Sequence, residues 1–157
     1  MEVTVLGSSG TYPAQGKACA GYLVSEGSTH LLLDCGPGVV ANLQAHTTIR
    51  ELGAVVISHM HPDHFLDLVS MCYAIAYGGQ RPSGPLPVCF PPGGADLWER
   101  LVALFGESAS VLRGALMVSE YRPGKAWSLG GMELRPMPVR HYVPSYGLRV
   151  SAGGILA

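Results

Sequence analysis

Three histidines and one aspartate lie within a six-residue segment, His59-Met60-His61-Pro62-Asp63-His64. Imidazole nitrogens and carboxylate oxygens are ligands that suit zinc and related divalent ions. The segment follows an apolar run, Ala54-Val55-Val56-Ile57, which is typical of a buried strand. Pro62 and the short spacings indicate a loop, where side chains can converge on one point. The pattern therefore predicts a metal site, and the number of candidate ligands indicates two ions.

Chance is a poor explanation of this cluster. The chain has 6 His in 157 residues, and random placement would produce the motif roughly twice in ten thousand trials on that composition. The alternative is a polar loop whose imidazoles only form hydrogen bonds, which is the usual role of a lone histidine. Four polar side chains at the end of a strand are hard to satisfy in that way.

The composition limits the classes of function. The apolar fraction is 48% and the charged fraction only 13%, whereas about 25% charged residues is typical of soluble domains. We therefore expect part of the surface to be apolar or covered by a partner. The net charge of −1 provides no overall positive field to attract nucleic acid. The length favours one domain over residues 1–157.

The sequence predicts neither a membrane span nor an export signal. No apolar run reaches the roughly 18 residues that a membrane span requires, and residues 1–15 lack the basic start of a signal peptide. We expect no membrane association and a cytoplasmic location. The cysteines have no CxxC spacing, which predicts reduced and mostly buried thiols: Cys19, Cys35, Cys72 and Cys89.

Strand and helix patterns alternate in the first two thirds of the chain, and strand patterns dominate the last third. This order predicts an α/β (α+β) fold with a mixed sheet covered by helices. The expected helices are Val39–His46, Phe65–Tyr77 and Ala95–Phe105. The expected strands are Glu2–Leu6, Gly21–Val24, His30–Leu33, 54–57, Val88–Phe90, Leu116–Tyr121, Ala126–Leu129, Met132–Val139, Gly147–Val150 and Gly154–Ala157.

Several motifs, taken in order, resemble those of the metallo-β-lactamase fold superfamily of metallohydrolases, and within it the ribonuclease Z-like branch. The resemblance implies a metallo-β-lactamase-like αββα sandwich of two similar halves. This chain would supply the first half and a little of the second. The matching segments are Leu6–Pro13, Gly21–Val24, Leu32–Gly38, Ser58–His64, and His141 with Pro144, Gly147 and Arg149.

The resemblance also implies a set of metal ligands. His59, His61 and His141 would bind a first zinc ion, and Asp63 and His64 a second. Asp63 would in addition act as the catalytic residue that orients or deprotonates the water between the ions. Manganese or iron is an alternative to zinc, because histidine and carboxylate ligands accept all three. Asp34 would support the site without binding the metal directly.

Two further ligands that the resemblance implies, a bridging Asp and a late His, have no counterpart here. The sequence contains no Asp or His after His141. A second ion would then have only two ligands from this chain. We therefore expect the chain to be incomplete at its C-terminus, with a missing C-terminal half or a second copy of the chain as its partner. The inner face of the sheet would then lie bare.

The resemblance implies a hydrolase that uses zinc-activated hydroxide, since zinc lowers the pKa of a bound water to about 7. The expected substrate is a phosphodiester or related ester, in a small molecule or a nucleic acid. One alternative is an amide or thioester hydrolase of the β-lactamase type. The other is a truncated, non-catalytic metal-binding half-domain.

Other polar side chains near these motifs are weaker candidates for a functional role. Tyr142 and Tyr146 could line a substrate pocket, but packing roles are equally compatible with their positions. Arg140 and Arg149 could hold a phosphate, although a charge on a strand surface is the favoured interpretation. Asp67 is expected on a helix surface or as a group that orients a ligand histidine.

Overall fold

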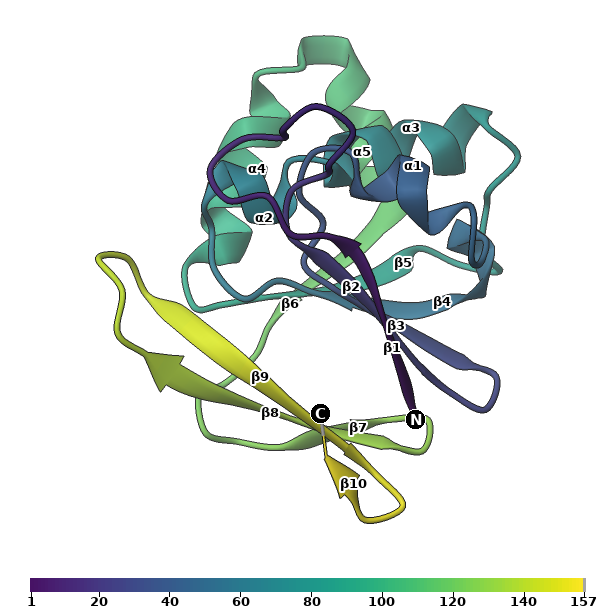
Figure 1. The fold of residues 1–157 in the computed structure, drawn as a ribbon. Coiled ribbons are helices and arrows are strands. Elements are labelled where there is room, and N and C mark those ends of the chain that lie inside the picture. The colour runs from purple at the N-terminus through teal and green to yellow at the C-terminus, as the bar shows by residue number, and fades with distance from the viewer. Residues whose placement is uncertain (157) are drawn as a thin grey trace.

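The computed structural model describes residues 1–156 as two stacked β-sheets, with helices over the outer face of the first sheet (Figure 1). The first sheet has the strand order β1-β2-β3-β4-β5-β6: β1 (Glu2–Gly7), β2 (Gly21–Glu26), β3 (Thr29–Leu33), β4 (Leu52–Val56), β5 (Leu86–Phe90) and β6 (Leu116–Glu120). The second has the order β10-β9-β8-β7: β7 (Trp127–Leu129), β8 (Met132–Val139), β9 (Ser145–Ala152) and β10 (Ile155–Leu156).

The first sheet changes from antiparallel to parallel at β3. Strands β1, β2 and β3 form an antiparallel meander, and β3 to β6 pair in parallel. The carboxyl ends of these parallel strands therefore meet at one edge, where open α/β sheets place their ligand sites. The connections contain α1 (Val39–Leu43), α2 (Pro62–Phe65), α3 (Leu68–Tyr77), α4 (Gly94–Ala103), α5 (Ala109–Ala115) and two short 3₁₀ turns, Ile49–Glu51 and Gly106–Ser108.

Helix α3 shows how the helical layer is attached. Its buried residues are Leu68, Met71, Cys72 and Ile75, and their spacing places them along one stripe of the helix. The predicted helix Phe65–Tyr77 is divided in the structure into α2 and α3. The reason lies at Asp67. Its backbone N–H donates to the carbonyl of Cys35 at 3.0 Å instead of to a carbonyl within the helix, which interrupts the helical hydrogen-bond pattern.

Helix α5 lies where the sequence shows no strong pattern. Ser110 and Gly114 are poor helix formers in this segment, so the local preference is weak. Ala109, Leu112 and Ala115 are nevertheless buried in the core between the helices and the sheet. Tertiary packing thus stabilises a helix that local propensity alone does not predict.

The inner face of the first sheet is covered at its centre by the second sheet. Leu31 and Val56 pack in one cluster with Leu134 and Val150. The expectation of a bare inner face is therefore wrong for the central strands, because the β8–β9 hairpin supplies the covering side chains.

The edges of the first sheet remain exposed. On β1, Val3 and Val5 are 47% and 61% exposed, and on β6 Met117 is 57% exposed. The outer face of the second sheet has no helix over it within residues 1–156 (Figure 1). The described residues therefore supply three of the four expected layers. The last expected strand is present as β10, whereas Ala157 lies outside the described residues.

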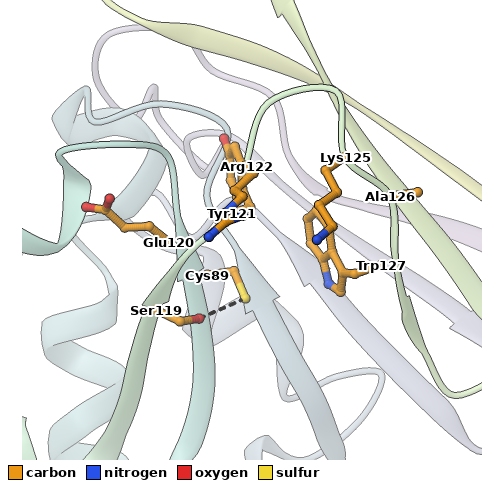
Figure 2. A pocket seen from close by; sticks show the side chains of 8 residues that line it. All are labelled: Cys89, Ser119, Glu120, Tyr121, Arg122, Lys125, Ala126 and Trp127. Carbon is orange, nitrogen blue, oxygen red and sulfur yellow. Dashed lines mark hydrogen bonds between the residues drawn. The ribbon is translucent and has the colours of Figure 1, made fainter.

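A cavity of about 290 Å³ opens beside β6 and the start of β7 (Figure 2). The Tyr121 and Trp127 rings are stacked with centroids 5.8 Å apart on its wall, and the Cys89 Sγ and Ser119 Oγ atoms lie 3.3 Å apart. None of the predicted metal ligands lines this cavity. In the described chain, no helix combines the length and apolar character needed to cross a membrane.

The packing of the two sheets predicts the effect of truncating Leu134, which is 0% exposed in the inner core. Leu134→Ala should lower the free energy of unfolding by about 2–5 kcal/mol. Leu104→Ala is the matched control, because Leu104 is 81% exposed, and it should change stability by less than about 0.5 kcal/mol. Urea denaturation measures both. Equal, small effects would mean that the second sheet is not packed as described.

Candidate metal centre

The segment that carries the four clustered ligands, residues 59–64 and here called the metal-motif loop, lies at the edge where the parallel strands end. It follows β4, whose neighbour β3 ends at Leu33, directly before Asp34. His61 is the N-cap of α2, and Pro62 occupies the first turn, where its fixed φ favours helix initiation. The single turn of α2 then directs Asp63 and His64 back toward the strand ends. Local sequence thus accounts for four of the five predicted ligands being together.

His141 reaches the same place from the second sheet. It lies in the loop between β8 and β9, and the backbone N–H of Tyr146 donates to the carbonyl of Ser58 at 3.2 Å. The hydroxyl of Tyr121 donates to the carbonyls of Ile57 and Ser58, at 3.0 and 3.1 Å. These bonds attach the metal-motif loop to the segment that leads into the second sheet.

The three histidine rings face one another. The Nδ1 atom of His61 is 3.1 Å from Nε2 of His59 and 3.2 Å from Nε2 of His141. All three ligand atoms lie within 4.8 Å of one another. Two nitrogen ligands of one tetrahedral zinc ion are roughly 3.3 Å apart, given Zn–N distances near 2.0–2.1 Å. The spacing of this trio therefore fits a shared ion.

The hydrogen bonds of the surrounding groups favour a proton on the Nδ1 atoms of His59 and His64. A carboxylate can only accept, so the Nδ1 of His64 and the Oγ of Ser58 both donate to Oδ2 of Asp34, at 2.7 and 2.8 Å. The Ser58 oxygen then accepts from Nδ1 of His59, at 3.0 Å. In the neutral form of each ring, these bonds leave the Nε2 atoms of His59 and His64 with a free lone pair, which is the form that binds metal.

Asp63 and His64 form a second pair beside the trio. The Oδ2 of Asp63 and the Nε2 of His64 are 3.6 Å apart, and the ring centroids of His59 and His64 are 3.9 Å apart. The backbone N–H of Thr11 donates to the same Asp63 oxygen at 2.7 Å. The structure thus brings all five predicted site residues together, as a trio and an adjoining pair.

Asp34 connects the strand end to this loop. It is only 5% exposed, adopts the left-handed φ of 59°, and also accepts the backbone N–H of Ser58 at 2.7 Å. This agrees with the supporting position expected of Asp34. A left-handed conformation is uncommon for a non-glycine residue, and a short polar side chain such as Asp tolerates it best.

The surroundings of His59 and His64 shift the pKa values of these two histidines in opposite directions. Burial, together with the neighbouring His64, lowers the pKa of His59 to about 4, so His59 is neutral near pH 7. Burial alone would lower the pKa of His64, but the hydrogen bond and charge of Asp34 raise it above the ordinary value. Burial would raise the pKa of Asp63, whereas the Thr11 N–H and nearby histidines lower it.

The fold leaves little room around the Asp63 backbone. A Cβ atom on Gly36 would lie 1.9 Å from the carbonyl oxygen of Asp63 and 2.7 Å from the Cβ of Cys19. The turn after β3, the loop after β1 and the metal-motif loop therefore pack against one another at this glycine. The contributions of Thr11, Ser58 and Gly36 are not apparent from residue type, since they depend on loops that meet only after folding.

The remaining polar candidates have different positions. The Tyr142 ring lies 4.8 Å from that of His61 and 4.6 Å from that of His141, and Tyr142 is 84% exposed. Tyr146 packs against the inner cluster. Arg149 pairs with Arg135 along β9 and β8, which agrees with a strand-surface charge. Asp67 accepts the backbone N–H of Val40 at 2.8 Å and so joins two helices.

Comparison with known proteins identifies the family. The family model described as "Beta-lactamase superfamily domain" matches residues 29–155. The chain belongs to the β-lactamase superfamily. The crystal structure of the metallo-beta-lactamase fold protein YhfI from Bacillus subtilis covers 98% of this chain, with a TM-score of 0.83 and 26% identity. The expected metallo-β-lactamase fold is therefore confirmed.

Two further similarities concern the ribonuclease Z-like branch. A protein named Ribonuclease Z from Mycobacterium bovis BCG is 30% identical over 168 residues. The crystal structure of human tRNase Z, short form, has a TM-score of 0.79 at 21% identity, which is a likeness of fold. The resemblance predicted from the sequence is confirmed. The chain spans 60% of the Mycobacterium protein, and 58% of the YhfI chain and 67% of the human one.

The hydrogen bonds of Asp34 predict the effect of removing its charge. Asp34→Asn keeps the shape of the side chain but replaces one carboxylate oxygen by an NH2 group, which cannot accept a hydrogen bond. The donors from Ser58 and His64 can then no longer all be satisfied. Affinity for metal at His64 should fall by roughly 10–100-fold, as measured by zinc titration with a chromophoric chelator. Asp96→Asn is the control, because the Asp96 side chain is 81% exposed and should leave zinc binding unchanged. An unaltered affinity in Asp34→Asn would exclude a role for Asp34 in orienting His64.

Proposed function

We propose that this chain is the metal-binding part of a hydrolase that acts on a phosphodiester or a related ester through zinc-activated hydroxide. The observation that supports this most is the spacing of three histidine nitrogens, contributed by two different sheets. Membership of the superfamily agrees with a metal-dependent hydrolase.

The five proposed ligands would form two metal-binding positions. His59, His61 and His141 would hold a first zinc ion, and Asp63 and His64 a second, with manganese or iron as alternatives. When bound, such ions supply Lewis acidity and lower the pKa of a coordinated water, so that hydroxide is available near neutral pH. They also neutralise a phosphodiester without requiring a basic protein surface.

Asp63 has the contacts expected of the catalytic residue. The N–H of Thr11 fixes one carboxylate oxygen, and the lowered pKa keeps Asp63 ionised near pH 7. An ionised, oriented carboxylate can hold the attacking water by a hydrogen bond and accept its proton. The substrate could be a small molecule or a nucleic acid, because the chain's net charge of −1 favours neither.

We further propose that the complete catalytic unit includes residues that this sequence does not contain. The second position has two ligands from this chain, and the relatives YhfI and Ribonuclease Z are longer, with 60% of each matched. A C-terminal half or a second copy of the chain would supply the rest. Free thiols at all four cysteines agree with the cytoplasmic location predicted from the sequence.

A non-catalytic role is the second candidate. It is favoured by the same observation that only two ligands surround the second position. A metal-binding part that assists assembly would bind one ion at the trio and hydrolyse nothing. Zinc content and turnover, measured on the same preparation, distinguish the two functions.

His61 lies between the other two histidines and offers the sharpest test of the proposal. His61→Ala should abolish both tight zinc binding and hydrolysis of bis(p-nitrophenyl) phosphate, because the remaining two nitrogens no longer surround an ion. His46→Ala is the control, since His46 is exposed and does not belong to the histidine cluster. Wild-type protein with bound zinc and no hydrolysis would favour the non-catalytic candidate.

The role proposed for Asp63 predicts unequal effects of its removal. Asp63→Ala should reduce kcat by roughly 10²–10⁴-fold, the range for loss of a general base, while the trio keeps its ion. Steady-state kinetics and elemental analysis measure the two effects. Asp96→Ala serves as the exposed control. If occupancy and turnover fell in parallel, Asp63 would be a ligand without a separate catalytic role.

A further inference from the structure

A small cavity of about 220 Å³ adjoins the histidine trio. Met60 forms one wall and lies between two of the histidines in the chain. Val143 and Pro144 form another wall, directly after His141 and Tyr142. The third wall is the loop between β5 and α4, with the first turns of that helix. The lining includes Met60, Pro91, Pro92, Leu97, Val143 and Pro144.

The lining of this cavity is apolar. It contains no charged or hydroxyl-bearing side chain, and Gly93 is its other lining residue. A dry cavity of about 150 Å³ is large enough to bind benzene, so the present volume accommodates a phenyl-sized group. Such a cavity favours uncharged apolar groups and provides no partner for a phosphate.

The walls are held in place by backbone constraints. Gly93 has a φ of 82° and is the N-cap of α4, a conformation that suits glycine. A Cβ on Gly94 would lie 2.7 Å from the Cβ of Phe90 and 3.0 Å from the sulfur of Met60. Pro91, Pro92 and Pro144 restrict the flanking φ angles. The cavity is thus a preformed feature of the fold at this edge.

We infer that this cavity is a substrate subsite that receives an uncharged apolar substituent, aryl or branched alkyl, of the ester bound at the metal centre. The inference rests on the proposed function and narrows its substrate class. Met60 and Val143 are each within two residues of a proposed ligand, so a group held at the trio can extend directly into the cavity. A nucleic-acid strand would instead place its next phosphate against apolar side chains. The subsite therefore favours a small organic ester.

Binding of phosphinate anions to the zinc-loaded chain tests this without requiring turnover. Dimethylphosphinate and methyl(phenyl)phosphinate present the same anionic group and differ in one substituent. Isothermal titration calorimetry should give a dissociation constant about tenfold lower for the phenyl compound, as expected for moving an apolar group from water into a pocket. In spectra of methyl-labelled methionine, the phenyl compound alone should shift the Met60 resonance through its ring current.

Leu97 allows the cavity to be filled from a helix that holds no proposed ligand. Leu97→Trp should reduce the phenyl advantage to less than about twofold, and Leu97→Lys, at this half-buried position, should do the same by making the wall polar. Leu104→Trp makes the same change at an 81% exposed position on the end of that helix and should keep the full advantage.

Two results would overturn the inference alone: equal affinity of the wild-type chain for both phosphinates, or a phenyl advantage that persists in both Leu97 variants. Failure of the zinc-loaded chain to bind either phosphinate would overturn the subsite together with the proposed function, because the metal centre would then not accept the anionic group.

Discussion

The buried carboxylate of Asp34 is the contact on which the rest of the site depends. It accepts the backbone N–H and hydroxyl of Ser58 and the Nδ1 of His64. A carboxylate away from water requires this number of donors to offset its lost hydration. In accepting them, it fixes the loop after β4 to the end of β3 and sets the proton positions of two histidines. Local backbone strain and metal-ligand orientation are thus linked through one side chain.

The site also depends on the packing of one sheet against the other. His141 belongs to the β8–β9 hairpin, and its distance to His61 is set by the inner core around Leu31, Leu134 and Val150. The bond from Tyr146 to Ser58 transmits that packing directly to the metal-motif loop. Consequently, the trio needs both sheets, whereas the Asp63–His64 pair needs only the first sheet and its loops. The two positions should differ in how strongly they depend on the second sheet.

The sequence predicts the parts of this site that are local. The strand before the motif, the loop set by Pro62 and the four ligands from His59 to His64 follow from residue type and spacing. His141, 77 positions beyond His64, could be assigned only by resemblance, because nothing in its own neighbourhood marks a ligand. The donor from Thr11 and the closeness of Gly36 to Asp63 arise from loops that meet in space. Helix α5 and the covered inner face were missed because tertiary packing determines both.

The central claim is that side chains from two sheets share one ion. Anomalous diffraction at the zinc edge, from crystals grown with zinc at low concentration, tests it directly. We expect a peak about 2.0–2.1 Å from Nε2 of His59, Nδ1 of His61 and Nε2 of His141, the bond length for zinc and imidazole. A peak bound only by residues 59–64, with the His141 ring turned away from it, would contradict the account.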